Sequence, residues 1–216
     1  MSCFEGLLLY SQITGSEKWK TAVCRFAERL RQSDITVIGC AGCTHELLDH
    51  SAVAQTDPDR TGIMQETCVT VTWMKLCAKL LLLTGDSVWA DEIEKSAYNA
   101  LYGSVNLHQN PENGGLPFDS YSPLRANKRA RFIGGFQKME NGTFFYGCCA
   151  AIGAAGTGLF PNLHLLRAGD EIVLEFYTQG KIKFTLQNGH PVTIRTRTAY
   201  PVSYTHLRAH ETGRNL

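Results

Sequence analysis

The chain has 216 residues, of which 44% are apolar and 19% are charged, and 21 Lys and Arg residues nearly balance 20 Asp and Glu residues. This composition excludes a disordered chain, which needs low hydrophobicity and a large net charge. Without a basic excess, we expect no nucleic-acid partner. Apolar runs such as Leu80–Leu83 are far shorter than the roughly 20 residues that span a bilayer, so we also expect no membrane partner.

Eight cysteines are spread irregularly along the chain. Secreted disulfide folds are small and dense in cysteine, whereas this chain is long and apolar enough to form a core without disulfides. The first residues include an acid, Glu5, where a secretory signal would carry basic residues. We therefore expect a reducing, cytoplasmic compartment, in which some thiols are metal ligands or nucleophiles.

A short motif occurs twice, at Ile13–Trp19 (ITGSEKW) and at Leu83–Trp89 (LTGDSVW). Gly15 and Gly85 suit the left-handed conformation that ends a helix, and the Ser or Asp that follows can cap the next helix. The tryptophan of each copy can then pack back on the preceding helix. Each copy predicts a helical hairpin, and repeated hairpins build a stacked or toroidal array. Two copies cannot close a ring, so we expect the array to be incomplete.

The remaining helical pattern lies in two segments. Residues 34–65 are rich in turn residues and predict a loop, whereas residues 67–83 present a broad apolar face typical of a helix. Residues 103–145 are rich in Gly, Pro and Asn and predict a long loop with short strands. Residues 150–159 are small and apolar, which indicates one tightly packed helix despite two glycines.

After Pro161 the pattern becomes one of short alternating runs, at 164–166, 171–176, 181–186 and 192–197. Such spacing predicts an antiparallel β meander and the start of a β-sandwich domain. We thus expect a mainly α-helical chain, with residues 1–160 in a partial helical domain and residues 161–202 in a partial β domain. Residues 203–216 fit neither pattern and resemble translated adaptor sequence, so we expect a non-native tail.

The strongest group of reactive side chains is Glu66, Cys68, Cys148 and Cys149. Three thiolates and one carboxylate have the ligand types and number of a tetrahedral zinc site. Residues two apart on a helix point in nearly opposite directions, so Glu66 and Cys68 can converge only at a helix entrance. Cys148 and Cys149 can face one ion only on a bent backbone, which Gly147 permits. The alternative is that these thiols are buried as small apolar side chains.

Two further candidates lie in the loop before this group. Cys40 and Cys43 form a C-x-x-C sequence, which is read as a redox pair, as half of a zinc site, or as simple packing. Glu46 is a candidate general acid, since partial burial would raise its pKa, although the local sequence alone favours a cap or surface role. The neighbouring His45 is a candidate contact for a substrate hydroxyl.

These motifs together resemble glycoside hydrolase family 127, whose best-known members are β-L-arabinofuranosidases. The resemblance rests on the Thr-Gly-Asp-x-x-Trp hairpin, on Glu66-Thr67-Cys68 before an apolar helix, on Tyr146-Gly147-Cys148-Cys149, and on the β segment beyond. It covers roughly residues 5–200. It implies the C-terminal part of an (α/α)6 barrel followed by the first strands of an antiparallel β-sandwich, in a truncated member of the family.

The resemblance also implies a role for each site residue. Zn²⁺ would be held by Glu66, Cys68, Cys148 and Cys149. Cys148 would be the nucleophile of a retaining glycoside hydrolase, and Glu46 would be its acid/base. Tyr121 would contact the carbohydrate substrate, a terminal L-arabinofuranose or a related sugar.

Two other functions remain open from the sequence. Zinc with four protein ligands and no open position is also typical of a structural site, so the chain could be a non-catalytic carbohydrate-binding or structural protein. A thiol oxidoreductase would instead use Cys40 and Cys43 as a disulfide pair. Because a partial toroid exposes apolar faces, we expect poor stability or association into homo-oligomers.

Overall fold

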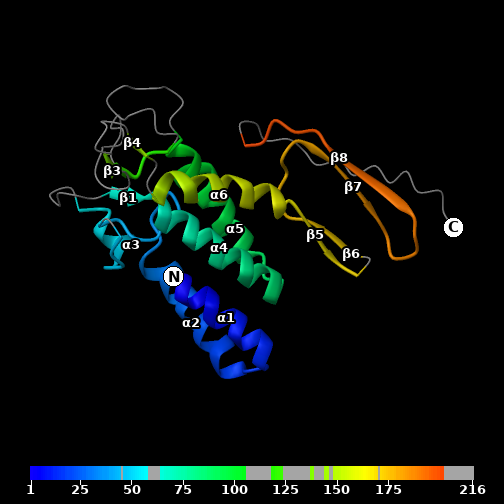
Figure 1. Ribbon diagram of the computed structural model, residues 1–216, viewed down its shortest axis with the longest axis horizontal. Coiled ribbons are helices and arrows are strands. Elements are labelled where there is room, and N and C mark those ends of the chain that lie inside the picture. Colours follow the sequence, from blue (N-terminus) through cyan, green and yellow to red (C-terminus); the bar gives the residue numbers. More distant parts are fainter. Residues whose placement is uncertain are drawn as a thin grey trace. The chain divides into compact units, whose positions relative to one another are not determined.

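A computed structural model describes residues 1–44, 46–57, 64–105, 118–123, 137–138, 144–145, 148–169 and 171–201. The chain divides into two compact units, Met1–Asn162 and Leu163–Leu216. All the helices lie in the first unit, and the described elements of the second are strands (Figure 1). The prediction of a mainly α-helical chain is therefore confirmed. The predicted tail, 203–216, lies outside the described residues.

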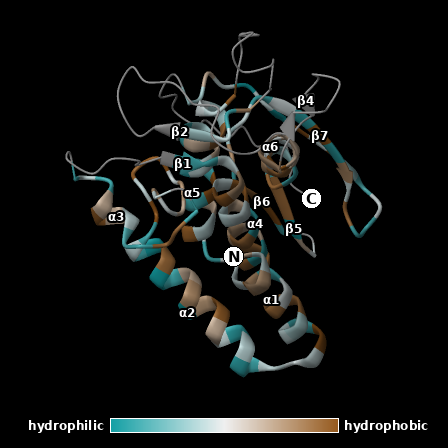
Figure 2. Cartoon of the chain, turned by 60° about the vertical axis from the view of Figure 1, so that its left-hand side comes forward, coloured by the Kyte–Doolittle hydropathy of each residue, from teal (hydrophilic) through white to brown (hydrophobic). Residues whose placement is uncertain are grey.

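The first hairpin consists of α1 (Ser2–Thr14) and α2 (Glu17–Ser33). Gly15 ends α1 in the left-handed conformation, with φ 68° and ψ 18°. The rings of Phe4 and Phe26 stack between the two helices with centroids 3.6 Å apart. Along α2, hydrophobic and hydrophilic residues alternate, as expected for a helix with one packed face (Figure 2).

The second hairpin consists of α4 (Thr67–Thr84) and α5 (Val88–Lys95), which continues as the π-helix η1 (Ser96–Leu101). The predicted packing of the motif tryptophans is confirmed for Trp89, which is 5% exposed and meets Trp73 of α4 edge to face. It is wrong for Trp19, which is 37% exposed. The Trp19 ring instead lies 5.0 Å from the ammonium group of Lys18.

Helix α4 is the core of the first unit, since it contacts α1, α2, α5, η1 and α6. Among the described helices it is the one long and apolar enough to cross a membrane by length and composition, yet 56% of it is buried inside the protein. Those apolar side chains are therefore used in helix packing.

Helix α6 (Cys148–Asn162) is longer than predicted and begins at the vicinal cysteines. Its glycines have a steric reason, because a Cβ on Gly153 would lie 2.6 Å from the Phe118 ring. A Cβ on Gly156 would lie 2.6 Å from Cγ2 of Val71 on α4. The glycines thus allow α6 to lie close against its neighbours.

Short elements bring the loops to the helix ends. Helix α3 (Ser51–Ala54) lies within the predicted loop at 34–65. Strand β1 (Met64–Glu66) pairs antiparallel with β2 (Tyr121–Pro123), which places Glu66 opposite Tyr121. Strands β3 (Gln137–Lys138) and β4 (Phe144–Phe145) form a second small pair. The β1–β2 pairing fixes the long loop against the start of α4.

The second unit contains the four predicted strands: β5 (Leu165–Ala168), β6 (Glu171–Leu174), β7 (Gly180–Thr185) and β8 (Pro191–Thr196). They pair antiparallel as β5–β6 and β7–β8. Exposed residues alternate with half-buried ones along β6 and β8, as the sequence predicts. The described part of the second unit has two two-stranded sheets rather than one meander, because no ladder joins β6 to β7.

Candidate metal centre

Glu66 lies where β1 ends and α4 begins. It is the N-cap residue of α4, with φ −121° and ψ 132°, and its Oε2 accepts a 2.6 Å hydrogen bond from the Val69 amide. The carboxylate therefore satisfies one free amide of the first helical turn. Cys68 is the second residue of α4, so the pair converges at a helix entrance, as the spacing predicts.

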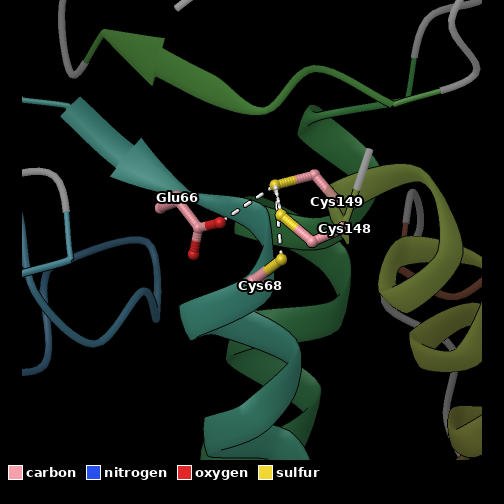
Figure 3. Close-up of side chains that lie close together, drawn as sticks. All are labelled: Glu66, Cys68, Cys148 and Cys149. Atoms are coloured by element: carbon pink, nitrogen blue, oxygen red, sulfur yellow. Dashed lines mark hydrogen bonds between the residues drawn. The ribbon is translucent and has the colours of Figure 1, made fainter. Parts of the chain in front are cut away.

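Cys148 and Cys149 are the first two residues of α6. The Cys149 side chain is buried, whereas that of Cys148 is exposed. Gly147, which was expected to bend the backbone here, lies outside the described residues. Both cysteines nevertheless reach the same place from the first turn of their helix (Figure 3).

The structure brings together all four predicted ligands. One donor atom from each of Glu66, Cys68, Cys148 and Cys149 lies within 4.8 Å of the other three. The Sγ atom of Cys149 is 3.3 Å from Sγ of Cys68, 3.8 Å from Sγ of Cys148 and 2.9 Å from Oε1 of Glu66 (Figure 3). Such a group of convergent donors is able to hold a metal ion.

The electrostatics of this cluster favour a cation. The hydrogen bond between the two sulfurs, together with burial, raises the pKa of Cys68, while the same hydrogen bond lowers the pKa of Cys149. Burial raises the pKa of Cys148, and the Glu66 carboxylate acts in the same direction on all three thiols. Without a cation the cluster therefore retains protons. A divalent ion would remove the repulsion between the anionic forms and release those protons.

Glu46 and Tyr121 meet next to the cluster. The Tyr121 hydroxyl donates a 2.9 Å hydrogen bond to Oε1 of Glu46. Burial, together with this bond to a carboxylate, raises the pKa of Tyr121, so the hydroxyl remains a donor. The partial burial expected for Glu46 is not observed, because its side chain is exposed. His45, the other predicted substrate contact, lies outside the described residues.

A cavity of about 370 Å³ joins these groups. Glu46, Glu66, Cys68 and Cys148 all line it, and the rest of its described wall is formed by Met1, Ser2, Leu48, Val69 and Thr72. One carboxylate outside the cluster thus shares a space with the exposed thiol of the cluster. A carboxyl group and a thiol are residue types that serve as general acids and nucleophiles in enzymes.

The C-x-x-C pair does not join the cluster. Among the described residues, the convergent donors are the four named above, and neither Cys40 nor Cys43 is among them. Both thiols are free and fully buried. Burial raises the pKa of Cys40 to about 12. A thiol in this state is a poor nucleophile, which favours the packing interpretation over a redox pair.

The profile of the β-L-arabinofuranosidase GH127 catalytic domain matches residues 2–157. The chain belongs to this family. No curated protein matches it.

Solved structures of GH127 members share the fold. A GH127 β-L-arabinofuranosidase from Geobacillus stearothermophilus T6 is 21% identical, with a TM-score of 0.66 over 92% of this chain and 30% of its own. A structure described as a GH127 β-arabinofuranosidase is 19% identical, with a TM-score of 0.70 over 92% of this chain and 29% of its own. A third, described as a glycoside hydrolase, is 16% identical, with a TM-score of 0.66 over 92% and 34%. The chain thus spans about a third of the length of these proteins.

Two contacts in this GH127 chain were not predicted from the sequence. Thr72 lines the cavity and its hydroxyl donates a 2.7 Å hydrogen bond to the Cys68 carbonyl, one turn back along α4. The helical spacing of Thr72 and Cys68 is a signal that the sequence does contain. The Ser120 carbonyl, 3.8 Å from Sγ of Cys149, depends on the long loop and has no local signal.

Proposed function

We propose that the chain is part of a retaining β-L-arabinofuranosidase with a cysteine nucleophile, Cys148, and a carboxylate acid/base, Glu46. The observation that carries this proposal is the single cavity lined by both side chains. A retaining glycosidase needs a nucleophile and a proton donor that reach the same glycosidic bond. Family membership and the activity of the structural relative from Geobacillus stearothermophilus T6 support the sugar class.

We also propose that the cluster binds Zn²⁺ through Glu66, Cys68, Cys148 and Cys149. Zinc–sulfur bonds of about 2.3 Å in a tetrahedron require sulfur–sulfur distances of about 3.8 Å. Cys149 has sulfur neighbours at 3.3 and 3.8 Å, so the cluster needs to open by only a few tenths of an ångström, estimated against that tetrahedral geometry. When bound, the ion would hold the coordinated thiols as thiolates at neutral pH.

The exposure of Cys148 separates this proposal from a purely structural zinc site. A closed structural site buries its ligands, and Cys149 and Glu66 are indeed buried. Cys148 is instead exposed and lines the cavity. One ligand of the four is thus accessible to a substrate, which favours an enzyme over a non-catalytic protein.

In the first step Cys148 attacks the anomeric carbon of the arabinofuranoside. A carbon–sulfur bond forms as the bond from the anomeric carbon to the leaving oxygen breaks, and Glu46 donates its proton to that oxygen. Tyr121 holds Oε1 of Glu46 through its hydroxyl, which leaves the second carboxyl oxygen for the substrate.

In the second step Glu46 acts as a base. It takes a proton from a water molecule, whose oxygen attacks the anomeric carbon while the carbon–sulfur bond breaks. Cys148 leaves as the thiolate and Glu46 is again protonated, so the catalyst is restored. Two inversions at the same carbon give net retention of configuration.

We further propose that residues 1–160 belong to an (α/α)6 barrel and residues 161–202 to the start of a β-sandwich. Two stacked helical hairpins and two antiparallel strand pairs support this assignment. A reducing compartment, as in the cytoplasm, suits eight free thiols.

Hydrolysis of an aryl β-L-arabinofuranoside by matched cysteine variants tests the nucleophile. Cys148→Ala should lower kcat by about a thousandfold or more, whereas Cys24→Ala, which removes a thiol from α2 outside the cavity, should leave it unchanged. Mass spectrometry of the protein with an activated substrate should show one added pentosyl unit, absent in Cys148→Ala. Turnover of Cys148→Ala at the parental rate would show that the nucleophile is misassigned.

The leaving group tests the acid. Glu46→Gln should lose far more activity on an alkyl arabinofuranoside, whose leaving oxygen needs a proton, than on a nitrophenyl one. Equal losses on both substrates would rule out Glu46 as the proton donor. Metal analysis of the purified chain should find one zinc ion per molecule.

A further inference from the structure

The buried thiol of Cys40 connects the loop before α3 to the metal centre. Its Sγ lies 3.7 Å from the backbone carbonyl oxygen of Glu66 and 3.3 Å from that of Gly42. The side chain is 0% exposed, and the one S–H donor of a thiol can be shared between these two carbonyl oxygens. The Glu66 carbonyl also accepts a 3.1 Å bond from the Thr70 hydroxyl. The backbone of Glu66 is thus held by donors from two separate segments.

The same loop is also bound to η1, through a contact between Gly39 and Ser96. The Ser96 hydroxyl donates a 2.7 Å hydrogen bond to the Gly39 carbonyl. Gly39 has φ +85°, and a Cβ there would lie 2.7 Å from the backbone N and Cα of Ser96. No residue larger than glycine fits at position 39 without a shift of the backbone. The loop therefore contacts Ser96 through Gly39 and Glu66 through Cys40.

The loop also has a defined internal structure. The Cys40 amide donates to Oγ1 of Thr36, and the Thr36 amide donates to the Cys40 carbonyl, at 3.1 and 2.9 Å. The Gly42 amide donates to the Asp34 carbonyl at 2.9 Å. Glu46 follows this segment after a few residues and lines the cavity. Residue 40 therefore lies in a hydrogen-bonded segment that leads directly to the part of the chain carrying Glu46.

We propose that Cys40 is a positioning residue, whose single S–H group, shared between the Gly42 and Glu66 carbonyls, sets the Glu46 loop in register with the start of α4. Glu46 and Glu66 come from different segments yet must line one cavity, and Cys40 joins those segments. The inference rests on the proposed function, in which Glu46 transfers the proton. In this proposal Cys40 of the C-x-x-C sequence has a role that requires neither a disulfide nor a metal ion.

Three variants of the full chain separate positioning from packing. Cys40→Ala removes the donor, and Cys40→Ser restores a donor in a similar volume. Cys77→Ala is the matched control, since it removes a thiol equally buried within α4. For each variant we would measure kcat, KM, the absorption spectrum of the Co²⁺-loaded protein, and amide hydrogen exchange of a peptide covering residues 34–44.

Cys40→Ala should lower kcat by about tenfold, since small misplacements of a catalytic group cost that much or more, and leave KM within about twofold. Amide exchange in residues 34–44 should rise by about threefold to tenfold, the loss expected for one hydrogen bond. The thiolate-to-Co²⁺ absorption should be unchanged, because all four ligands remain. Cys40→Ser should recover most of both effects, and Cys77→Ala should show neither.

Two results would overturn the inference. One is equal behaviour of Cys40→Ala and Cys77→Ala in kcat and in exchange. The other is a loss in Cys40→Ser as large as in Cys40→Ala, which would mean that sulfur volume matters and the donor does not. If the unaltered chain hydrolyses no arabinofuranoside, the proposed function fails, and the exchange of residues 34–44 alone decides whether Cys40 fixes the loop.

Discussion

Replacement of Gly156 by alanine should loosen the contact that places α6 against α4. The new Cβ would lie 2.6 and 3.2 Å from the two methyl groups of Val71 and 3.0 Å from Cδ2 of Leu101. Carbon atoms normally pack at about 3.5–4.0 Å, so the shortfall is about 1 Å at the closest contact. Val71 is fully buried and, as a β-branched residue, has few alternative rotamers. The helices must therefore separate.

Overpacking of a protein core lowers the free energy of unfolding by about 1–3 kcal/mol. A better helix propensity of alanine offsets about 1 kcal/mol of this. The net loss is then at most about 2 kcal/mol, which corresponds to a fall in Tm of up to about 8 °C for a chain of this size. Because α6 begins with Cys148 and Cys149, its movement should also weaken metal binding by about tenfold, the effect typical of disturbed support around a metal site.

Gly158→Ala is the matched control for this substitution. Gly158 lies on the same helix, and a Cβ there would meet nothing within 4 Å. Alanine at this position should raise stability by about 0.4–1 kcal/mol. Thermal unfolding followed by circular dichroism, and competition with a metal chelator, would compare the two variants. If Gly156→Ala is as stable as Gly158→Ala and binds metal equally, the close approach of α6 to α4 does not position the cluster.

Three other predictions concern separate parts of the molecule. Trp89→Ala should cost about 3–5 kcal/mol of unfolding free energy, whereas Trp19→Ala should cost less than about 1 kcal/mol, as urea titrations would show. In the metal-free protein the pKa of the Cys40 thiol is raised above its ordinary value of 9.0. Above pH 9.0 this thiol therefore loses its proton in the unfolded chain but keeps it in the folded chain. Stability should therefore fall as the pH rises from 9.0 to about 12, by up to about 1.4 kcal/mol per pH unit, and Cys40→Ala should flatten this slope in urea titrations. Tyr121→Phe should lower kcat/KM by about tenfold, because it removes the hydroxyl that donates to Glu46; an unchanged kcat/KM would contradict the role given to that bond.

Much of the helical part could be predicted because its signals are local. Gly15 and Gly85 both adopt φ 68°, as the repeated Thr-Gly motif predicts. The apolar run at 67–83 corresponds to α4, which extends by one further residue. Backbone conformations of this kind depend on a few neighbouring residues, so sequence alone identifies them.

The burial of the repeated tryptophans could not be predicted from the same motif. Trp19 and Trp89 occupy equivalent positions, yet one is exposed and the other is buried against Trp73. The difference depends on which side chain the preceding helix presents, since α4 offers an aromatic ring at this point. A pattern of spacing carries no such information about the partner.

The metal cluster could be predicted from the sequence, but its surroundings could not. The spacing of Glu66 and Cys68 predicts that they lie at a helix entrance. This prediction is correct, because Glu66 caps α4. The contact of Tyr121 with Glu46 instead depends on pairing of β1 with β2 across a long loop. The exposure of Glu46 follows from that tertiary arrangement as well. Contacts between distant loops therefore account for the missed features.

The predicted ligands lie at the starts of two helices, a position that would help the cluster to accept negative charge once a cation releases its protons. Cys68 lies in the first turn of α4, and Cys148 and Cys149 lie in the first turn of α6. Helix N-termini carry partial positive charge and unpaired amides, which stabilise anions and lower thiol pKa values. Glu66 uses one oxygen to cap α4 and directs the other to Cys149. The same side chain thus caps the core helix and contributes a donor atom to the cluster.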